Sequence, residues 1–150
     1  MTQIRTIKLD SFETKDVKDS HINGKLTLIW RDYDKLIDFS PKMIYLTSVK
    51  SGEIKGPHLH TKRDSYFVCI RGKVIFIIKN EDGSYQEIES SEDNPTMIKI
   101  PKGIISAHIN PTNDISSVLT IANIAWKPDD NEMKNIFFND YNWKKWIENK

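Results

Sequence analysis

Two histidines separated by one residue, His58 and His60, are the side chains of this sequence best placed to do chemistry. They follow a tight approach built from Gly52, Gly56 and Pro57, and they precede a long run of residues typical of strands. Because side chains alternate between the two faces of a strand, the two imidazoles should point the same way. Such a pair serves either as metal ligands or as acid–base groups, since imidazole binds metals and titrates near neutral pH.

Length and composition bound what the protein can be. The 150 residues predict a single domain over residues 1–150, and the net charge of +1 gives no reason to expect nucleic acid or an anionic membrane as a partner. The one cysteine, Cys69, excludes an internal disulfide, fits a reducing compartment and is expected to be a small buried residue. Without an apolar leader or a run of membrane-spanning length, a cytoplasmic protein is expected.

Most of the chain has the pattern of short strands bounded by Gly, Pro, Asn, Asp or Ser. Strands that turn back every ~8–12 residues predict an antiparallel sandwich or barrel, with a pocket at its mouth that contains the histidine pair. Helical spacing occurs only near the end, where Trp143 and Ile147 predict a short helix over 139–149. The predicted strands cover 24–30, 42–49, 65–71, 73–79, 85–89, 96–100, 104–110 and 116–126.

The histidine pair belongs to a longer pattern of spacings. One segment runs from Gly52 through the two histidines to Asp64, and a second runs from Pro101 through Ser106 to Asn110. Together they resemble the two-part cupin signature, G-x5-H-x-H-x3-E followed by P-x-G-x2-H-x3-N. Two positions depart from it, because Asp64 stands where the family has Glu and Ser106 stands where it has His.

The second departure bears on metal binding. In metal-binding cupins the two histidines, the carboxylate and the second-motif histidine hold the ion together, and a serine hydroxyl is a poor substitute. His108 lies on the same face as Ser106, but two residues along a strand move a ligand by ~6–7 Å. We therefore expect a site that works without a tightly bound metal or any other cofactor.

Three further segments narrow the resemblance. K-G-P-H-L-H-T-K over residues 55–62, V-C-I-R-G over 68–72 and the turn at Asp82-Gly83 are similar to the dTDP-4-keto-6-deoxyglucose 3,4-ketoisomerases (WxcM-like cupins), whose pattern is R-G-x-H-x-H-K-x, V-C-L-x-G and D-G. Tyr45 and the W-K-K-W segment at 143–146 extend the match over most of the chain. The resemblance implies an all-β cupin, a jelly-roll antiparallel β-barrel. The dTDP-4-dehydrorhamnose 3,5-epimerases are more distantly similar.

The resemblance implies an isomerase that moves the keto group of a dTDP-linked 4-keto-6-deoxyhexose from C4 to C3. The C3 proton is acidified by the neighbouring ketone, and a group that titrates near neutral pH can remove it and return it elsewhere through an enediolate. His58 and His60 are then the proton-transfer pair. Tyr45 is expected to hydrogen-bond the sugar, and Asp64 to orient a histidine and set its tautomer.

Four more residues are expected to bind the substrate: Lys55, Arg63, Ser106 and His108. Lys55 stands where the family has Arg, so it would meet a diphosphate as a point charge. The alternative role for Lys55 and Arg63 is a solvated charged rim. For Tyr45 the alternative is ordinary packing on a strand, and for Asp64 it is a carboxylate in a turn. A homodimer is expected from the resemblance and because a small barrel must protect its edge strands.

Three functions remain open from the sequence. The first is the 3,4-ketoisomerase. The second is a 3,5-epimerase, which is disfavoured because those enzymes have Gln in place of His60 and a catalytic tyrosine on a late strand, whereas residues 116–126 contain none. The third is a non-catalytic cupin that binds a sugar or a nucleotide.

Overall fold

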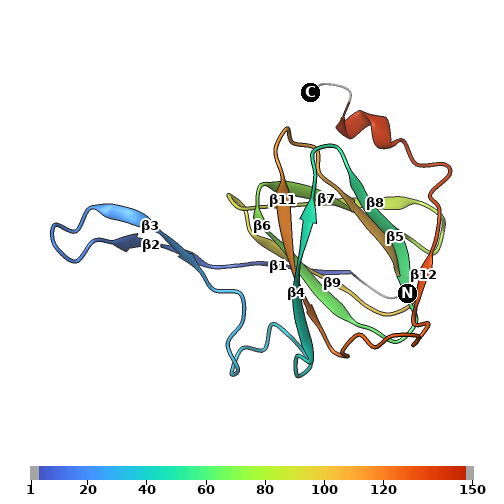
Figure 1. Cartoon of the computed structure of the whole chain (residues 1–150), viewed down its shortest axis with the longest axis horizontal. Coiled ribbons are helices and arrows are strands. Elements are labelled where there is room, and N and C mark those ends of the chain that lie inside the picture. The colour runs from blue at the N-terminus through green and yellow to red at the C-terminus, as the bar shows by residue number, and fades with distance from the viewer. Residues whose placement is uncertain (1–3, 148–150) are drawn as a thin grey trace.

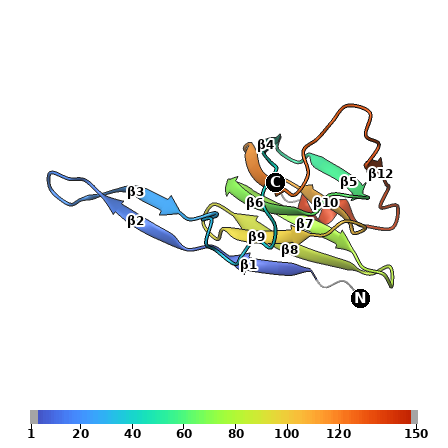
Figure 2. The same cartoon turned by 90° about the horizontal axis from the view of Figure 1, so that it is seen from below.

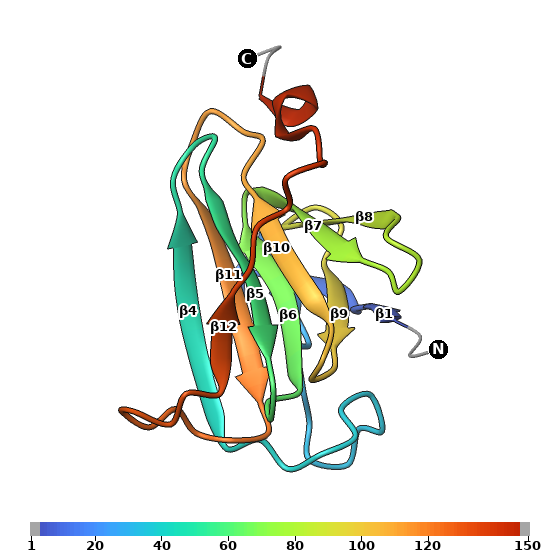
Figure 3. The same ribbon diagram turned by 90° about the vertical axis from the view of Figure 1, so that its right-hand side faces the viewer.

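Two five-stranded antiparallel sheets face each other in the computed structural model, which describes residues 4–147 (Figures 1 and 3). The first sheet has the strand order β1-β9-β6-β11-β4, the second has β12-β5-β10-β7-β8, and β2 and β3 form a separate hairpin. The strands are β1 Arg5–Lys8, β2 Ser11–Lys15, β3 Ile22–Thr27, β4 Met43–Val49, β5 Ile54–His60, β6 Ser65–Arg71, β7 Lys73–Lys79, β8 Tyr85–Ser91, β9 Thr96–Ile100, β10 Ile105–Ile109, β11 Ser116–Ala122 and β12 Met133–Asn135.

Apolar side chains from both sheets fill the space between them. Phe67 of the first sheet and Phe76 of the second meet there, with ring centroids 5.7 Å apart. Cys69 is fully buried in the same layer, and burial raises the pKa of its thiol to about 11, which confirms the small buried residue expected from the sequence. The buried members of this core are Val49, Cys69, Val74, Phe76, Ile78, Ile98, Ile100 and Val118.

Part of the outer face of each sheet is also covered. Ile37 packs on the first sheet against Tyr66 and Ile121, and Phe138 packs on the second sheet against Ile75 and the residues around it. A strand whose two faces are both covered by other residues has no face exposed to solvent, so its positions do not need to alternate between apolar and polar side chains. This explains why β7 reads as an unbroken apolar run instead of an alternating one.

The expected all-β jelly roll is confirmed, with two adjustments. The sheets of the described residues stay separate, so the body is a sandwich and not a closed barrel. The predicted strands over 65–71, 73–79 and 96–100 match β6, β7 and β9, whereas β1, β2, β5 and β12 are not among the predicted strands. The strand predicted over 24–30 is β3, which runs from Ile22 to Thr27, and the strand predicted over 116–126 is β11, which ends at Ala122.

The C-terminal helix is shorter than predicted. One 3₁₀ helix, Trp143–Trp146, is present, and residues 148 and 149 of the predicted helix lie outside the described part of the chain. The aromatic spacing that suggested a longer helix arises from packing on the second sheet, where the Tyr85 ring contacts Phe138 and Tyr141 with centroids 5.0 Å away in each case. Within residues 4–147 no helix has the length and apolar character needed to cross a membrane.

The β2–β3 hairpin extends away from the sandwich (Figures 1 and 2). Its root is attached to the body, since the Lys25 Nζ donates to the Glu92 carbonyl oxygen at 2.7 Å. Three large apolar side chains on it are largely exposed, namely Phe12 at 54%, Ile22 at 58% and Leu26 at 49%. Phe12 and Leu26 are cross-strand partners, so they form one apolar patch on the hairpin.

The homodimer remains a prediction, and this hairpin offers a way to test it. We expect Phe12→Asp to shift the protein from dimer to monomer, because a charge at the apolar patch disfavours burial against a second copy. Light scattering at micromolar concentration measures the mass. Glu13→Gln, on the opposite face of β2, should leave the mass unchanged. A monomeric unmodified protein would contradict the prediction.

Candidate functional site

A cavity of about 210 Å³ lies between the two sheets and contains most of the residues expected from the sequence. Tyr45, Thr47 and Phe67 line it from the first sheet, and β5, β10 and Phe76 line it from the second. Of the eight expected residues it brings together seven: Tyr45, Lys55, His58, His60, Arg63, Ser106 and His108.

An irregularity in β5 decides which of its side chains reach the cavity. Lys55 pairs with His108 whereas His58 pairs with Ser106, so three steps along β5 match two along β10. Gly56 takes up the extra residue with φ of +89°, and a Cβ there would lie 3.0 Å from the Ser106 carbonyl oxygen. The bulge reverses the alternation of side chains, and Lys55 therefore lies on the same side as His58.

Strand β12 and the residue just before it hold both histidines through their Nδ1 atoms. It pairs with β5 so that Asn135 is opposite His58 and Met133 is opposite His60. His58 Nδ1 lies 3.1 Å from Asn135 Oδ1, and His60 Nδ1 lies 2.5 Å from Glu132 Oε1. Both oxygens are acceptors, so each Nδ1 donates, and in the neutral ring Nε2 is left as an acceptor. The two ring centroids are 6.4 Å apart.

Burial sets the charge state of two of these rings. It lowers the pKa of His58; the bond to Asn135 opposes this, and the nearby His60 and Lys55 lower the pKa further. His108 is more deeply placed, against the rings of Phe67 and Phe76 at centroid distances of 6.4 and 5.2 Å. Burial, followed by the charges of Lys55 and His58, lowers the pKa of His108 to about 3, so this imidazole is neutral.

Asp64 does not orient a histidine. Its Oδ1 accepts from the Lys102 backbone N–H at 2.8 Å, and its Oδ2 lies 3.3 Å from Asn123 Nδ2. The carboxylate that pairs with a histidine is instead Glu132, which contacts His60 from 72 positions further along the chain. No local signal marks Glu132, because its contact exists only once β12 pairs with β5.

Arg63 is a wall residue and not part of a solvated rim. Its side chain is 6% exposed, and its Nε lies 3.5 Å from Glu132 Oε1. From the other end of the guanidinium, Nη1 donates to the Tyr45 hydroxyl at 3.4 Å. Arg63 therefore connects the carboxylate beside His60 with the tyrosine on the opposing sheet.

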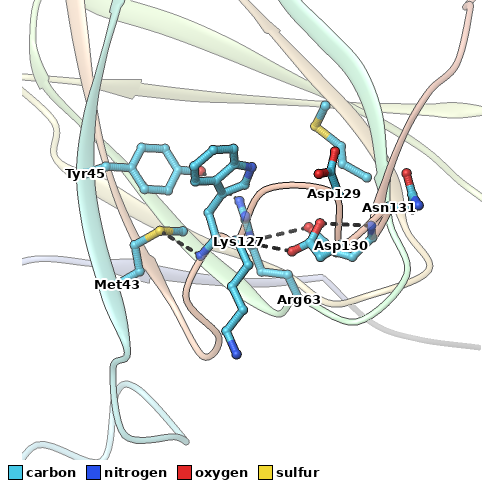
Figure 4. Close-up of a pocket in the computed structure, with 10 residues that line it drawn as sticks. Met43, Tyr45, Arg63, Lys127, Asp129, Asp130 and Asn131 are labelled. Atoms are coloured by element: carbon cyan, nitrogen blue, oxygen red, sulfur yellow. Dashed lines mark hydrogen bonds and ion pairs between the residues drawn. The ribbon is translucent and has the colours of Figure 1, made fainter.

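A larger pocket of about 540 Å³ adjoins the cavity, and Tyr45, Arg63 and Met133 line both. Figure 4 shows Tyr45 projecting from β4 toward Arg63, with Asp129, Asp130 and Asn131 of the following loop on the other side. Trp126, 63% exposed, adds an aromatic surface. Ligand pockets usually measure ~300–1,000 Å³, so the inner cavity alone suits only a small group, while the two together suit a longer ligand.

The donors around the cavity do not fit the cupin metal site. Asp64 is engaged with Lys102 and Asn123, and Glu132 Oε1 is held by His60. In the part of the chain that the structure describes, one group of three potential ligands lies within 4.8 Å, Asp16, Asp19 and His21. This group is at the far turn of the β2–β3 hairpin, away from the cavity. The absence of a bound metal stays a prediction.

Comparison with known proteins identifies the family. Residues 3–142 match the family model described as FdtA: WxcM-like, C-terminal. Because the match covers nearly the whole chain, the protein belongs to this family. No curated protein sequence matches the chain.

Solved structures share the fold. A dTDP sugar isomerase from Desulfovibrio desulfuricans G20 has a TM-score of 0.80 at 13% identity, over 94% of this chain and 90% of that one. QdtA, a sugar 3,4-ketoisomerase from Thermoanaerobacterium thermosaccharolyticum in complex with TDP, has a TM-score of 0.70 at 22% identity, over 97% and 93%. The capsular polysaccharide assembling protein CapF from Staphylococcus aureus has 0.60 at 19%, and there the alignment covers 65% of this chain but 29% of CapF.

The lowered pKa of His58 is testable by NMR titration of its ring. We expect a midpoint below the ordinary 6.5, and a higher midpoint in Asn135→Asp, because a carboxylate beside Nδ1 stabilises the imidazolium. Asn131→Asp adds the same charge in the loop of the outer pocket. In this variant the His58 midpoint should be nearly the same as in the unmodified protein. A midpoint above 6.5 in the unmodified protein would contradict the role of burial.

The buried His108 should affect stability in acid. In the folded protein it takes up a proton only near pH 3, whereas an unfolded chain takes it up near 6.5. The unfolded state therefore binds more protons between these values, and this contribution lowers the unfolding free energy as pH falls. His108→Phe removes the titrating group, so its Tm should fall less steeply with pH in thermal melts. Parallel slopes for the two proteins would refute the assignment.

Proposed function

We propose that the protein is a nucleotide-sugar isomerase that moves the keto group of a dTDP-4-keto-6-deoxyhexose from C4 to C3, in deoxysugar biosynthesis. The observation that carries this proposal is the histidine pair in the cavity. Both rings are held at Nδ1, by Asn135 of β12 and by Glu132 just before it, and in the described chain no protein hydrogen bond occupies either Nε2. Two fixed imidazoles with free acceptor nitrogens are suited to moving a proton between neighbouring carbons.

The reaction needs one carbon-bound proton to move and one hydroxyl proton to follow. A base takes the C3 proton, the electron pair forms the C3–C4 double bond, and the C4 oxygen becomes an enediolate. Return of the carbon-bound proton to C4, with loss of the O3 proton and gain of one at O4, yields the 3-keto sugar. His58 and His60 supply acceptors for these transfers because both rings line the same cavity.

Two side chains are placed to stabilise the enediolate oxygen. Lys55 brings an ammonium group to the cavity side of β5, and the Tyr45 hydroxyl faces the cavity from β4 with the Arg63 guanidinium behind it. An oriented donor at a developing oxyanion typically lowers the barrier by ~2.7–4 kcal/mol. Ser106, opposite His58 in the sheet, is a further donor at the cavity wall.

The outer pocket is the proposed place for the nucleotide. Its size suits the longer part of the substrate, and the exposed Trp126 ring offers a surface for stacking a base. Membership of the WxcM-like family supports a substrate of this class, as does the shared fold with a dTDP sugar isomerase and with QdtA in complex with TDP.

A 3,5-epimerase is the second candidate, and one feature favours it. Tyr45 belongs to the first sheet and the histidines to the second, so a tyrosine hydroxyl and the imidazoles lie on opposing walls. Inverting a carbon requires a proton to leave one face and return to the other. Because the tyrosine hydroxyl and the imidazoles lie on opposing walls, they could act on the two faces of a sugar carbon, even though β11 itself contains no tyrosine.

The experiment that separates these functions is incubation with dTDP-4-keto-6-deoxyglucose in D₂O, followed by NMR of the sugar. We expect a 3-keto product that retains its C5 proton. Deuterium at both C3 and C5 with the ketone still at C4 would establish the epimerase. Binding of the nucleotide sugar without exchange or isomerisation would favour the non-catalytic cupin.

Replacement of the histidines tests their role directly. His58→Asn and His60→Asn should each lower kcat by ~10²–10⁴, the usual worth of a general acid–base group, while retaining the fold by circular dichroism. His21→Asn, an exposed histidine on the β2–β3 hairpin, is the matched control and should retain full turnover. Normal turnover in both cavity variants would overturn the assignment.

A further inference from the structure

The side-chain carboxylate of Glu132 is ionised and almost fully buried. Its side chain is 2% exposed, and it lies in the segment that leads into β12. Burying a carboxylate is strongly unfavourable unless it is paired and hydrogen-bonded. Burial raises the pKa of Glu132, but the bond and charge of His60 and the nearby Lys62 N–H and Arg63 outweigh it, and the net pKa is below the ordinary value.

Three groups of one short segment, residues 60–63, converge on this carboxylate. His60 Nδ1 lies 2.5 Å from Oε1, Arg63 Nε lies 3.5 Å from the same oxygen, and the Lys62 backbone N–H lies 3.4 Å from Oε2. The main chain is fixed as well, because Thr61 donates to the Glu132 carbonyl oxygen from its N–H at 2.8 Å and from its hydroxyl at 3.0 Å. The acidic group that faces Glu132 from the preceding loop is Asp130, whose Oδ1 accepts from the Glu132 N–H at 3.3 Å.

The two histidines therefore have unlike partners. The Asn135 amide that holds His58 is neutral and can fix a tautomer but cannot balance a positive ring. The Glu132 carboxylate that holds His60 can do both, and it lies almost out of contact with solvent, where an electrostatic interaction is strongest.

We propose that Glu132 is a positioning residue for proton transfer, which holds the Nδ1 proton of His60, presents its Nε2 to the cavity and supports the ring when it carries the proton taken from carbon. This role rests on the proposed function. In the transfer, the C3–H electron pair goes into the enediolate, the proton goes to Nε2 of His60, and the same proton returns to C4, while O3 loses its proton and O4 gains one. Arg63 keeps the carboxylate ionised and in place between transfers.

The test is Glu132→Gln. The amide keeps the size of the side chain and can still accept from Nδ1, since its oxygen is drawn to the side of His60 and Arg63, but it carries no charge. We expect kcat to fall by ~10–100-fold with KM nearly unchanged, the usual effect of losing a partner that orients a functional histidine. Glu53→Gln, an exposed carboxylate before β5, is the control and should retain the full kcat.

A spectroscopic readout makes the test independent of turnover. The unmodified protein should show a strongly deshielded imidazole N–H proton in NMR, which disappears in His60→Asn and moves upfield in Glu132→Gln. If the unmodified protein turns over no dTDP-4-keto-6-deoxyglucose, the proposed function fails, and the proton signal alone decides the role of Glu132. A signal that is the same in Glu132→Gln, or a kcat equal to that of the Glu53→Gln control, would overturn the positioning role.

The single variant leaves Arg63 without its counter-ion and its fold must be checked by thermal melting. If Glu132→Gln does not fold, the double variant Glu132→Gln with Arg63→Gln removes both charges and is compared with Arg63→Gln alone. A lower kcat in the double variant than in Arg63→Gln supports the role of Glu132. Equal values would refute it.

Discussion

The pairing of β12 with β5 is the contact on which the site depends. Three residues, Met133–Asn135, add an edge to the second sheet and fix the register in which Asn135 meets His58. The residue just before the strand, Glu132, is placed by the same register beside His60. Without this short strand the two imidazoles would remain on β5, but neither would have a partner at Nδ1 and both would be free to rotate.

Such a short strand is stable because the body to which it adds is already complete. The inner layer between the sheets and the two outer apolar layers hold β5, β6 and β7 rigidly, so a segment that docks on β5 finds a preformed edge. The segments that cover the outer faces come from opposite ends of the chain, around Ile37 and around Phe138. The polar residues of the site are thus arranged on a frame that is built from apolar layers.

The parts of the site that were predictable from the sequence are those whose signal is local. The apolar run of β7 and the close spacing of His58 and His60 can be read without knowing any distant contact. Glu132 cannot, because the strand that follows it, Met133–Asn135, has only three residues, all at exposed positions, and no alternation of apolar and polar residues marks it as a strand. Asp64 was misassigned for a related reason: its spacing fits the motif, while its partners, Lys102 and Asn123, come from the ends of other strands.

The glycine bulge of β5 has a consequence for how this scaffold can change. Since the bulge at Gly56 absorbs one extra residue, deletion of that residue would place Lys55 two positions before His58, and ordinary alternation would keep both side chains on the cavity side. The cavity would keep its positive charge, and β5 would stay in register with β10 on both sides of Gly56. A change of one residue in length at this point is therefore absorbed locally, without turning the site residues of β5 away from the cavity.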